Sequence, residues 1–250
     1  AGDSRYWLVR GQLQQYSHDF KGALASLERA SRLAPEATEP VSWRAAIHMV
    51  RADYALATAE CERLEHIALP LVAQGCTAYV RGTTGQLLAA YDLLSQAVAG
   101  AGEVPPGLTL WAQTRLAEMA ARLQRWGDAE RHYRIALAQG ITDQFLLASY
   151  ADFLLVRERP QGAVKLLAGW ERSDVLLLRL ALAGRAARDP RAKEWAAQLR
   201  ERMQDAARRE IREETGLDVE VGPLIETFDR VHRDDQGRIR YHFVVVGFVC

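Results

Sequence analysis

Small residues recur along the chain at intervals close to 34, and this recurrence constrains the fold more than any other feature. They come in five pairs, each pair twelve residues apart: Gly11 and Ala23, Ala45 and Ala57, Ala78 and Ala90, Ala117 and Ala129, Ala151 and Ala163. Further small or apolar residues follow each pair at +4 and +7: Leu27 and Ala30, Cys61 and Leu64, Leu94 and Ala97, Tyr133 and Ala136, Leu167 and Trp170. Small side chains let two helices approach, and +4 and +7 continue one helix face. The pattern predicts pairs of antiparallel helices, and a helical bundle with coincidental alanine spacing is the alternative.

The first unit carries its residues at the spacings of a known family: Trp7, Gly11, Phe20, Ala23, Leu27, Ala30 and Pro35. The chain thereby resembles the tetratricopeptide repeat, although Arg10 and Gln14 depart from the family's preferences. The fourth unit is also close, and the second and third are degenerate. The resemblance implies a mainly α fold, an α-solenoid of about five units plus a capping helix pair over residues 1–204, which acts as a protein–protein interaction scaffold.

Two further helices are expected after the fifth unit. Residues 174–187 are leucine-rich, and residues 191 to about 215 are amphipathic. Proline lacks an amide donor and clashes with the preceding helical turn. We therefore expect all eight prolines to lie between or after helices: Pro35, Pro40, Pro70, Pro105, Pro106, Pro160, Pro190 and Pro223.

Composition excludes several classes of function. The 32 Lys and Arg residues balance 32 Asp and Glu residues, so the chain lacks the positive field that nucleic-acid binding uses. No apolar run is long enough for a membrane span, and the six histidines have no metal-ligand spacing. Cys61 and Cys76 fall on helices that should touch, where two buried thiols are favoured over a disulfide. We expect a cytoplasmic protein, and the absence of an initiator Met suggests a fragment or a processed form.

The concave side of such an array presents outward residues of the first helix of each unit. We predict a peptide-binding groove containing Tyr16, Met49, Tyr79, Trp111 and Phe145. Family members that grip chaperone C-termini use Lys and Asn to clamp a carboxylate, and this groove has neither. Aromatic residues with scattered acids suit an apolar or basic peptide instead, and packing of these aromatics between units is the alternative.

Residues 209–217 read Arg-Glu-Ile-Arg-Glu-Glu-Thr-Gly-Leu. This segment resembles the second half of the Nudix box, and residues 227–231 and 237–243 resemble the strands that follow it. We therefore expect residues 205–250 to be a partial Nudix-like segment, a small α+β fragment. Its signals are a helix end at Gly216, strands over 217–221 and 239–246, and a turn at 234–237.

Glutamates at i, i+3 and i+4 lie on one helix face, and here they are Glu210, Glu213 and Glu214. Such oxygen donors suit Mg²⁺, and the resemblance implies that all three bind the metal. It also implies latent catalytic roles for Glu210 and Glu214. The alternative is a surface helix in which these glutamates pair with neighbouring arginines.

The segment departs from the family where the box should begin. Trp195 replaces the leading glycine, and residues 196–200 replace the loop that brings backbone groups to metal and phosphate. We expect an inert segment, with Mg²⁺ as a cofactor only if it functions. The alternative is a Mg²⁺-dependent hydrolase of nucleoside diphosphates linked to another moiety, such as ADP-ribose or a nucleotide sugar, with the repeats as a targeting arm.

Overall fold

The computed structural model describes the backbone of residues 2–222, 224–233 and 239–248 and the side chains of residues 2–222. The chain forms two compact units, residues 1–142 and residues 143–250.

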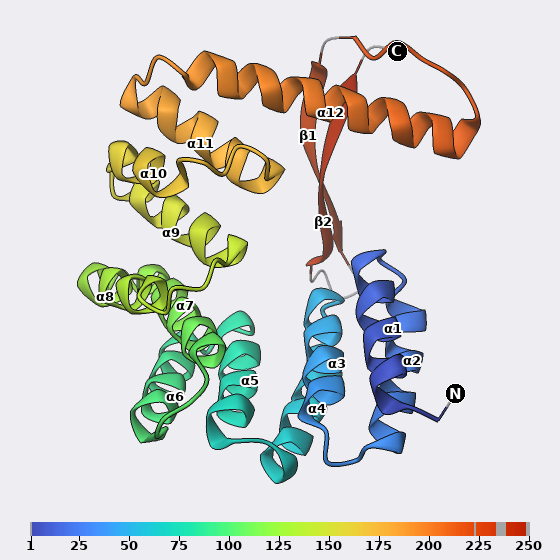
Figure 1. Ribbon diagram of the computed structural model, residues 1–250, viewed down its shortest axis with the longest axis vertical. Coiled ribbons are helices and arrows are strands. Elements are labelled where there is room, and N and C mark those ends of the chain that lie inside the picture. Colours follow the sequence, from blue (N-terminus) through green and yellow to red (C-terminus); the bar gives the residue numbers. More distant parts are fainter. Residues whose placement is uncertain (1, 223, 234–238, 249–250) are drawn as a thin grey trace. The chain divides into compact units, whose positions relative to one another are not determined.

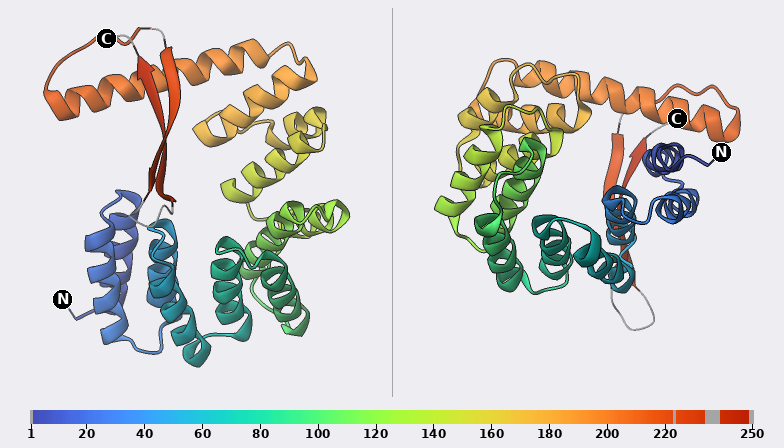
Figure 2. Two further views of the ribbon diagram at one scale, coloured as in Figure 1. Left: turned by 180° about the vertical axis from the view of Figure 1, so that it is seen from behind. Right: turned by 60° about the horizontal axis from the view of Figure 1, so that its bottom comes forward.

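The first unit consists of eight helices in four consecutive pairs (Figure 1). The helices are α1 (Ser4–Tyr16), α2 (Phe20–Leu33), α3 (Thr38–Val50), α4 (Tyr54–Ile67), α5 (Pro70–Thr83), α6 (Leu87–Gly100), α7 (Pro106–Arg122) and α8 (Trp126–Leu137). The two helices of each pair pack against each other, and the second helix of each pair contacts the first helix of the next. Figure 2 shows α1 and α2, and then α3 and α4, side by side from behind.

The small residues of the repeat lie where the helices of a pair cross, as predicted. All ten crossing residues are buried, and so are nine of the ten apolar positions that follow them. At Gly11 the approach is so close that an added Cβ would lie 2.7 Å from Cγ of Leu27. The exception is Trp170, which was expected on the second helix of the fifth pair. The helix there, α10, ends at Leu167, so Trp170 lies beyond it and is only partly buried.

The turns between the two helices of each pair share one backbone conformation, just as the crossings share small residues. One residue in each turn has a positive φ, with values from 53° to 99°: His18, Ala52, Gly85, Gln124, Glu158 and Arg188. The next residue donates its amide to a carbonyl five positions back, as in Asp19 to Gln14 and Asp53 to His48. This is the Schellman closure of a helix, which favours glycine at the left-handed position. Only one of these six turns has glycine there.

The second unit begins with α9 (Gln144–Val156), α10 (Pro160–Leu167), α11 (Asp174–Ala187) and α12 (Ala192–Thr215). The expected boundaries of α11 and α12 are confirmed. Trp195 is buried against α11, where an added Cβ on Gly184 would lie 2.6 Å from the indole ring. Helix α12 then continues without a break to Gly216, which ends it in the left-handed conformation.

The segment after α12 differs from the expectation of a strand over 217–221. Residues 217–222 form no regular element. They return along α12, where Gln204 Nε2 donates to the carbonyl of Gly222 at 3.0 Å and Val221 is buried. Strands β1 (Leu224–Arg233) and β2 (Ile239–Phe248) follow and pair antiparallel, with Phe228 opposite Val245. The turn expected at 234–237 lies outside the described residues.

Several prolines start helices rather than separate them. Pro70, Pro106 and Pro160 are the first residues of α5, α7 and α10, and Pro40 lies in the first turn of α3. The amides of the first turn have no partner inside the helix, so proline loses no hydrogen bond there. Among the helices that the structure describes, none combines the length and apolar character needed to cross a bilayer.

Candidate functional site

Three of the five predicted groove residues line one pocket in the first unit. Met49 comes from α3, Tyr79 from α5 and Trp111 from α7, which are the first helices of consecutive pairs. The pocket has a volume of about 230 Å³. Its other lining residues are mainly apolar: Ser42, Ala45, Ala46, Leu64, Val72, Cys76, Val80, Leu108 and Arg115. A pocket of this size and character can take one apolar side chain.

Trp111 is fixed in the pocket by a glycine on the neighbouring helix. A Cβ on Gly75 would lie 2.7 Å from the indole ring, so only glycine leaves room for Trp111 in this position. On the same wall, the guanidinium of Arg115 lies 4.7 Å from the centre of the Tyr79 ring and donates to Glu118 at 3.0 Å. These contacts give the pocket a preformed aromatic wall with a charged pair beside it.

The other two predicted groove residues lie elsewhere. Tyr16 is exposed near the end of α1, and its ring is 6.4 Å from that of Trp43 in an edge-on arrangement. Phe145 is exposed on α9 in the second unit. Conversely, the pocket contains Leu108 and Arg115, which sequence reasoning missed. Their spacing of three and four from Trp111 on a helix was the signal that could have found them.

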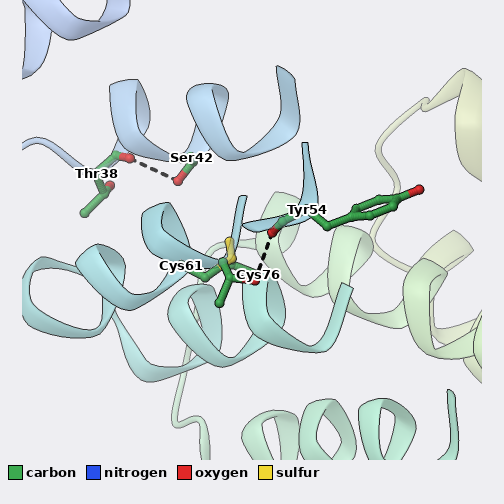
Figure 3. Close-up of a disulfide and its surroundings, with 6 residues drawn as sticks. Thr38, Ser42, Tyr54, Cys61 and Cys76 are labelled. Atoms are coloured by element: carbon green, nitrogen blue, oxygen red, sulfur yellow. Dashed lines mark hydrogen bonds between the residues drawn. A yellow bond between two sulfur atoms is a disulfide. The ribbon is translucent and has the colours of Figure 1, made fainter. Parts of the chain in front are cut away.

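A disulfide borders the pocket and corrects the expectation of two thiols. Cys61 on α4 and Cys76 on α5 are joined, with Cα atoms 5.4 Å apart (Figure 3). The expected contact between these two helices is confirmed, and it brings the sulfur atoms within bonding distance. Cys76 lines the apolar pocket, and Cys61 lines a second cavity of about 250 Å³. The disulfide therefore connects the wall of the pocket to the preceding helix pair.

A buried ion pair lies between α3 and α4 near the pocket. Arg44 Nε donates to Glu60 at 2.9 Å, and the same guanidinium pairs with Glu28 of α2. Both Arg44 and Glu60 are buried. His48 lies one turn further along α3, and burial lowers its pKa. Because ion pairs have no hydrophobic signature, the repeat pattern gave no sign of this cluster.

A second buried polar chain connects α6, α7 and α8. His132 Nδ1 lies 2.6 Å from Gln113 Oε1, and Nε2 lies 3.1 Å from the hydroxyl of Tyr91. Since the amide oxygen only accepts, Nδ1 donates to it and Nε2 accepts from the tyrosine. Burial lowers the pKa of His132, which matches this neutral imidazole. The neutral ring of His132 thus connects the three helices through two hydrogen bonds.

The three glutamates of the Nudix-like motif do not form a metal site. Glu210, Glu213 and Glu214 are all exposed on α12, and Glu213 lies 3.9 Å from Arg209. Among the described residues, no group of three or more Asp, Glu, His or Cys side chains is arranged to hold an ion. The helix also runs straight through residues 196–200, where the family has its loop. These residues therefore do not fit a Mg²⁺ ion with a bound pyrophosphate.

The known proteins that resemble this chain differ between its C-terminal part and its helical part, as its sequence motifs do. A family model described as the NUDIX domain matches residues 196–250. No curated protein matches the chain. The matched segment starts one residue after Trp195, inside α12.

Solved structures match the helical part of the chain. PilW, described as a widely conserved type IV pilus biogenesis factor, matches with a TM-score of 0.59 at 17% identity, over 78% of this chain and 91% of its own. PilF of Pseudomonas aeruginosa has a TM-score of 0.57 at 14% identity, over 79% and 90%. TTC0263, a TPR protein of Thermus thermophilus, has a TM-score of 0.54 at 18% identity, over 78% and 98%. Most of the chain therefore has a tetratricopeptide-repeat fold, and its C-terminal part matches the Nudix model.

Proposed function

We propose that this protein is a protein-interaction scaffold whose first unit binds an extended peptide through one apolar anchor side chain. The observation that carries the proposal is the pocket in which Met49, Tyr79 and Trp111 meet across three consecutive pairs. These residues are far apart in the sequence, and they converge only because the pairs are stacked. A concave apolar pocket with few polar groups is the usual form of a ligand site.

The chemistry of the pocket favours an apolar anchor over a carboxylate. No Lys or Asn lines it, and its arginine, Arg115, pairs with Glu118. A free peptide C-terminus would therefore have to compete with Glu118 for the guanidinium. An apolar side chain can instead enter the pocket while the peptide backbone passes the Arg115–Glu118 pair, and this arrangement leaves that ion pair intact.

Selection of displayed peptides tests the proposal. A library of random peptides on phage is selected against the full chain, and the selected peptides are measured against two neighbouring variants. Met49→Arg fills the pocket with a charged side chain and should abolish binding. Val50→Arg, at an exposed position beside it, should leave binding unchanged. Peptides that bind Met49→Arg as well as they bind the parent chain would show that the pocket is not the site.

For residues 205–250 we propose an incomplete and inert Nudix-like segment, made of the end of α12 with β1 and β2. The match to the Nudix model supports the relationship, and the straight helix through residues 196–200 argues against activity. The proposed boundary after residue 204 falls inside α12. This boundary marks where the resemblance changes from one family to the other, and it does not coincide with the boundary between the two compact units.

An activity assay distinguishes this proposal from the hydrolase alternative. The full chain with Mg²⁺ and ADP-ribose should release no AMP above background, and Glu214→Gln should behave identically. Turnover by the parent chain that Glu214→Gln loses would establish the hydrolase and make Mg²⁺ its cofactor. We propose no nucleic-acid partner, because the formal charge of the chain is zero.

A cytoplasmic location stays a prediction, and the disulfide offers a test of it. The cytoplasm keeps thiols reduced, so Cys61 and Cys76 should both be alkylated when cells are quenched in acid and treated with a thiol reagent. Recovery of the intact disulfide by mass spectrometry would point to an oxidising compartment instead.

A further inference from the structure

The disulfide lies both in the wall of the apolar pocket and at a junction between two helix pairs. Cys76 of α5 lines the pocket, and Cys61 of α4 is buried next to it (Figure 3). Helix α4 is the second helix of the second pair, and α5 is the first helix of the third. The bond therefore crosses the junction between these pairs at the place where the pocket forms.

The pocket takes its lining residues from both sides of this junction. Met49 and Leu64 belong to the second pair. Val72 and Tyr79 belong to the third pair, and Trp111 belongs to the fourth. The shape of the pocket thus depends on how α5 packs against α3 and α4, and the disulfide fixes that packing with a covalent link.

Both cysteine side chains are also part of the apolar core at the junction. Cys61 packs with Ala57 and Val80. Cys76 packs against that cluster and against the neighbouring one, which contains Leu64. Two thiols cannot lie as close together as two bonded sulfur atoms. Protein cores are close-packed, so neighbouring groups have to take up the separation that reduction imposes.

Cys76 is the cysteine that has room to move. Cys61 is 1% exposed, whereas Cys76 is partly exposed and borders the apolar pocket of about 230 Å³. The cavity beside Cys61 carries charged residues, among them Glu62, Glu65 and Arg81, and it suits a thiol less well. After reduction, the side chain of Cys76 can therefore turn into the pocket and occupy space that an anchor side chain needs.

We propose that the redox state of Cys61 and Cys76 controls the pocket, and that the oxidised chain binds its peptide more tightly than the reduced chain. This proposal rests on the peptide-binding function proposed above. A preformed site binds more tightly because less order has to be created on binding, and the disulfide preforms this one. Couplings between two binding events are typically about 5–150-fold, so we expect reduction to weaken binding roughly tenfold.

A dithiol supplies the two electrons for the reduction. One thiolate of the dithiol attacks Sγ of Cys76 on the pocket side, and Cys61 leaves as a thiolate that takes up a proton. The second thiol of the reagent then attacks the mixed disulfide, closes the reagent into a cyclic disulfide and releases Cys76. Because Cys76 lies in the wall of the pocket, a bound peptide covers the sulfur atom that is attacked.

Peptide affinity measured in both redox states tests the proposal. The probe is the tightest cysteine-free peptide selected on phage against the oxidised full chain, and Cys250→Ser removes the third cysteine. Dithiothreitol should weaken binding roughly tenfold in fluorescence anisotropy, with the helical circular dichroism unchanged. Cys61→Ala is the matched control, because it cannot form the bond and keeps Cys76 in the pocket wall. Its affinity should equal that of the reduced parent chain, with or without dithiothreitol.

The same coupling has to appear in the redox equilibrium. The chain is equilibrated in mixtures of reduced and oxidised dithiothreitol, and its free thiols are alkylated and counted by mass spectrometry. If reduction weakens peptide binding by a given factor, saturating peptide should raise the ratio of reduced to oxidised reagent at the midpoint by that same factor.

The outcomes separate this proposal from the peptide-binding function. Equal or tighter binding by the reduced chain would overturn redox control, and the function would stand if Met49→Arg still abolished binding. Failure to select any peptide against the oxidised chain would overturn both. A reduced chain that loses its helical circular dichroism would also overturn redox control, because the disulfide would then maintain the whole fold and not the pocket alone.

Discussion

The helix pairs of the first unit and helix α12 use similar local signals and differ in what they bury. Helix α8 has 12 residues and buries four of them, whereas α12 has 24 residues and buries only Trp195. Both are amphipathic. The difference is that α8 has small residues that are buried where it crosses another helix, whereas the small residues of α12 are not buried. Amphipathic periodicity is enough to specify a helix, but a buried core also needs small residues that let two helices approach closely.

The largest expected contrast comes from removing a buried leucine. Leu27→Ala in α2 should lower the free energy of unfolding by about 2–5 kcal/mol, because the side chain is fully buried and leaves a cavity. Met203→Ala on α12, where the side chain is 39% exposed, should lower the free energy of unfolding much less. Urea denaturation followed by circular dichroism measures both, and equal losses would contradict the contrast in burial.

Breaking the disulfide should have the next largest effect. Cys61 and Cys76 are separated by 15 residues in the sequence, and closing a loop of that size stabilises a fold by about 3 kcal/mol. Cys76→Ser should lower the melting temperature of the first unit. Dithiothreitol should lower the melting temperature of the parent chain by a similar amount and leave the variant unchanged.

A larger side chain at a helix crossing should reduce stability somewhat less than loss of the disulfide does. Ala117→Leu places a larger side chain where α7 meets α8 and should destabilise by about 1–3 kcal/mol. Ala196→Leu, at an exposed position on α12, is the matched control and should be close to neutral. An unchanged melting temperature for Ala117→Leu would contradict the register of the repeat.

Acidification should weaken the fold through its buried histidines. Burial lowers the pKa of His132 and His48 in the folded protein, so below the ordinary histidine pKa of about 6.5 the unfolded chain takes up protons more readily. Stability should be complete above that pH and decline as the pH falls below it. Denaturation curves at neutral and mildly acidic pH measure the decline, and His132→Gln should make it smaller.

The smallest effect tests the turns. Ala52 has a φ of 59°, a conformation that glycine adopts without strain, so Ala52→Gly should stabilise by about 0.5–1 kcal/mol. Ala25→Gly, at an exposed position inside α2, should destabilise by a similar amount. Opposite signs for these two substitutions would establish that the turn is strained.

The repeat predicted most of the helical fold because its signal is local and periodic. The crossing residues, the second helices and the boundaries of α11 and α12 follow from the spacing of apolar and small residues. The failures occur where that spacing carries no information. The alternation at residues 217–221 is typical of a strand, yet the segment returns along α12, with Gln204 bonded to Gly222.

The candidate site was predicted only in part for the same reason. Met49, Tyr79 and Trp111 were expected on the concave side, but their convergence depends on how three pairs stack and on Gly75, which makes room for the indole ring. Tyr16 satisfied the same sequence criterion and lies beside Trp43 instead. The spacing of residues on one helix says little about the distance between helices.

The sequence by itself determined the helix pairs and the match of residues 196–250 to the Nudix model, because both depend on residue types at fixed spacing along the chain. Tertiary structure decided the disulfide, the buried Arg44–Glu60 pair and the pocket. It also decided that the glutamates of α12, among the residues the structure describes, do not form a metal site. Each of these depends on distances between side chains on different helices or on their surroundings, and such distances are set only when the helices pack.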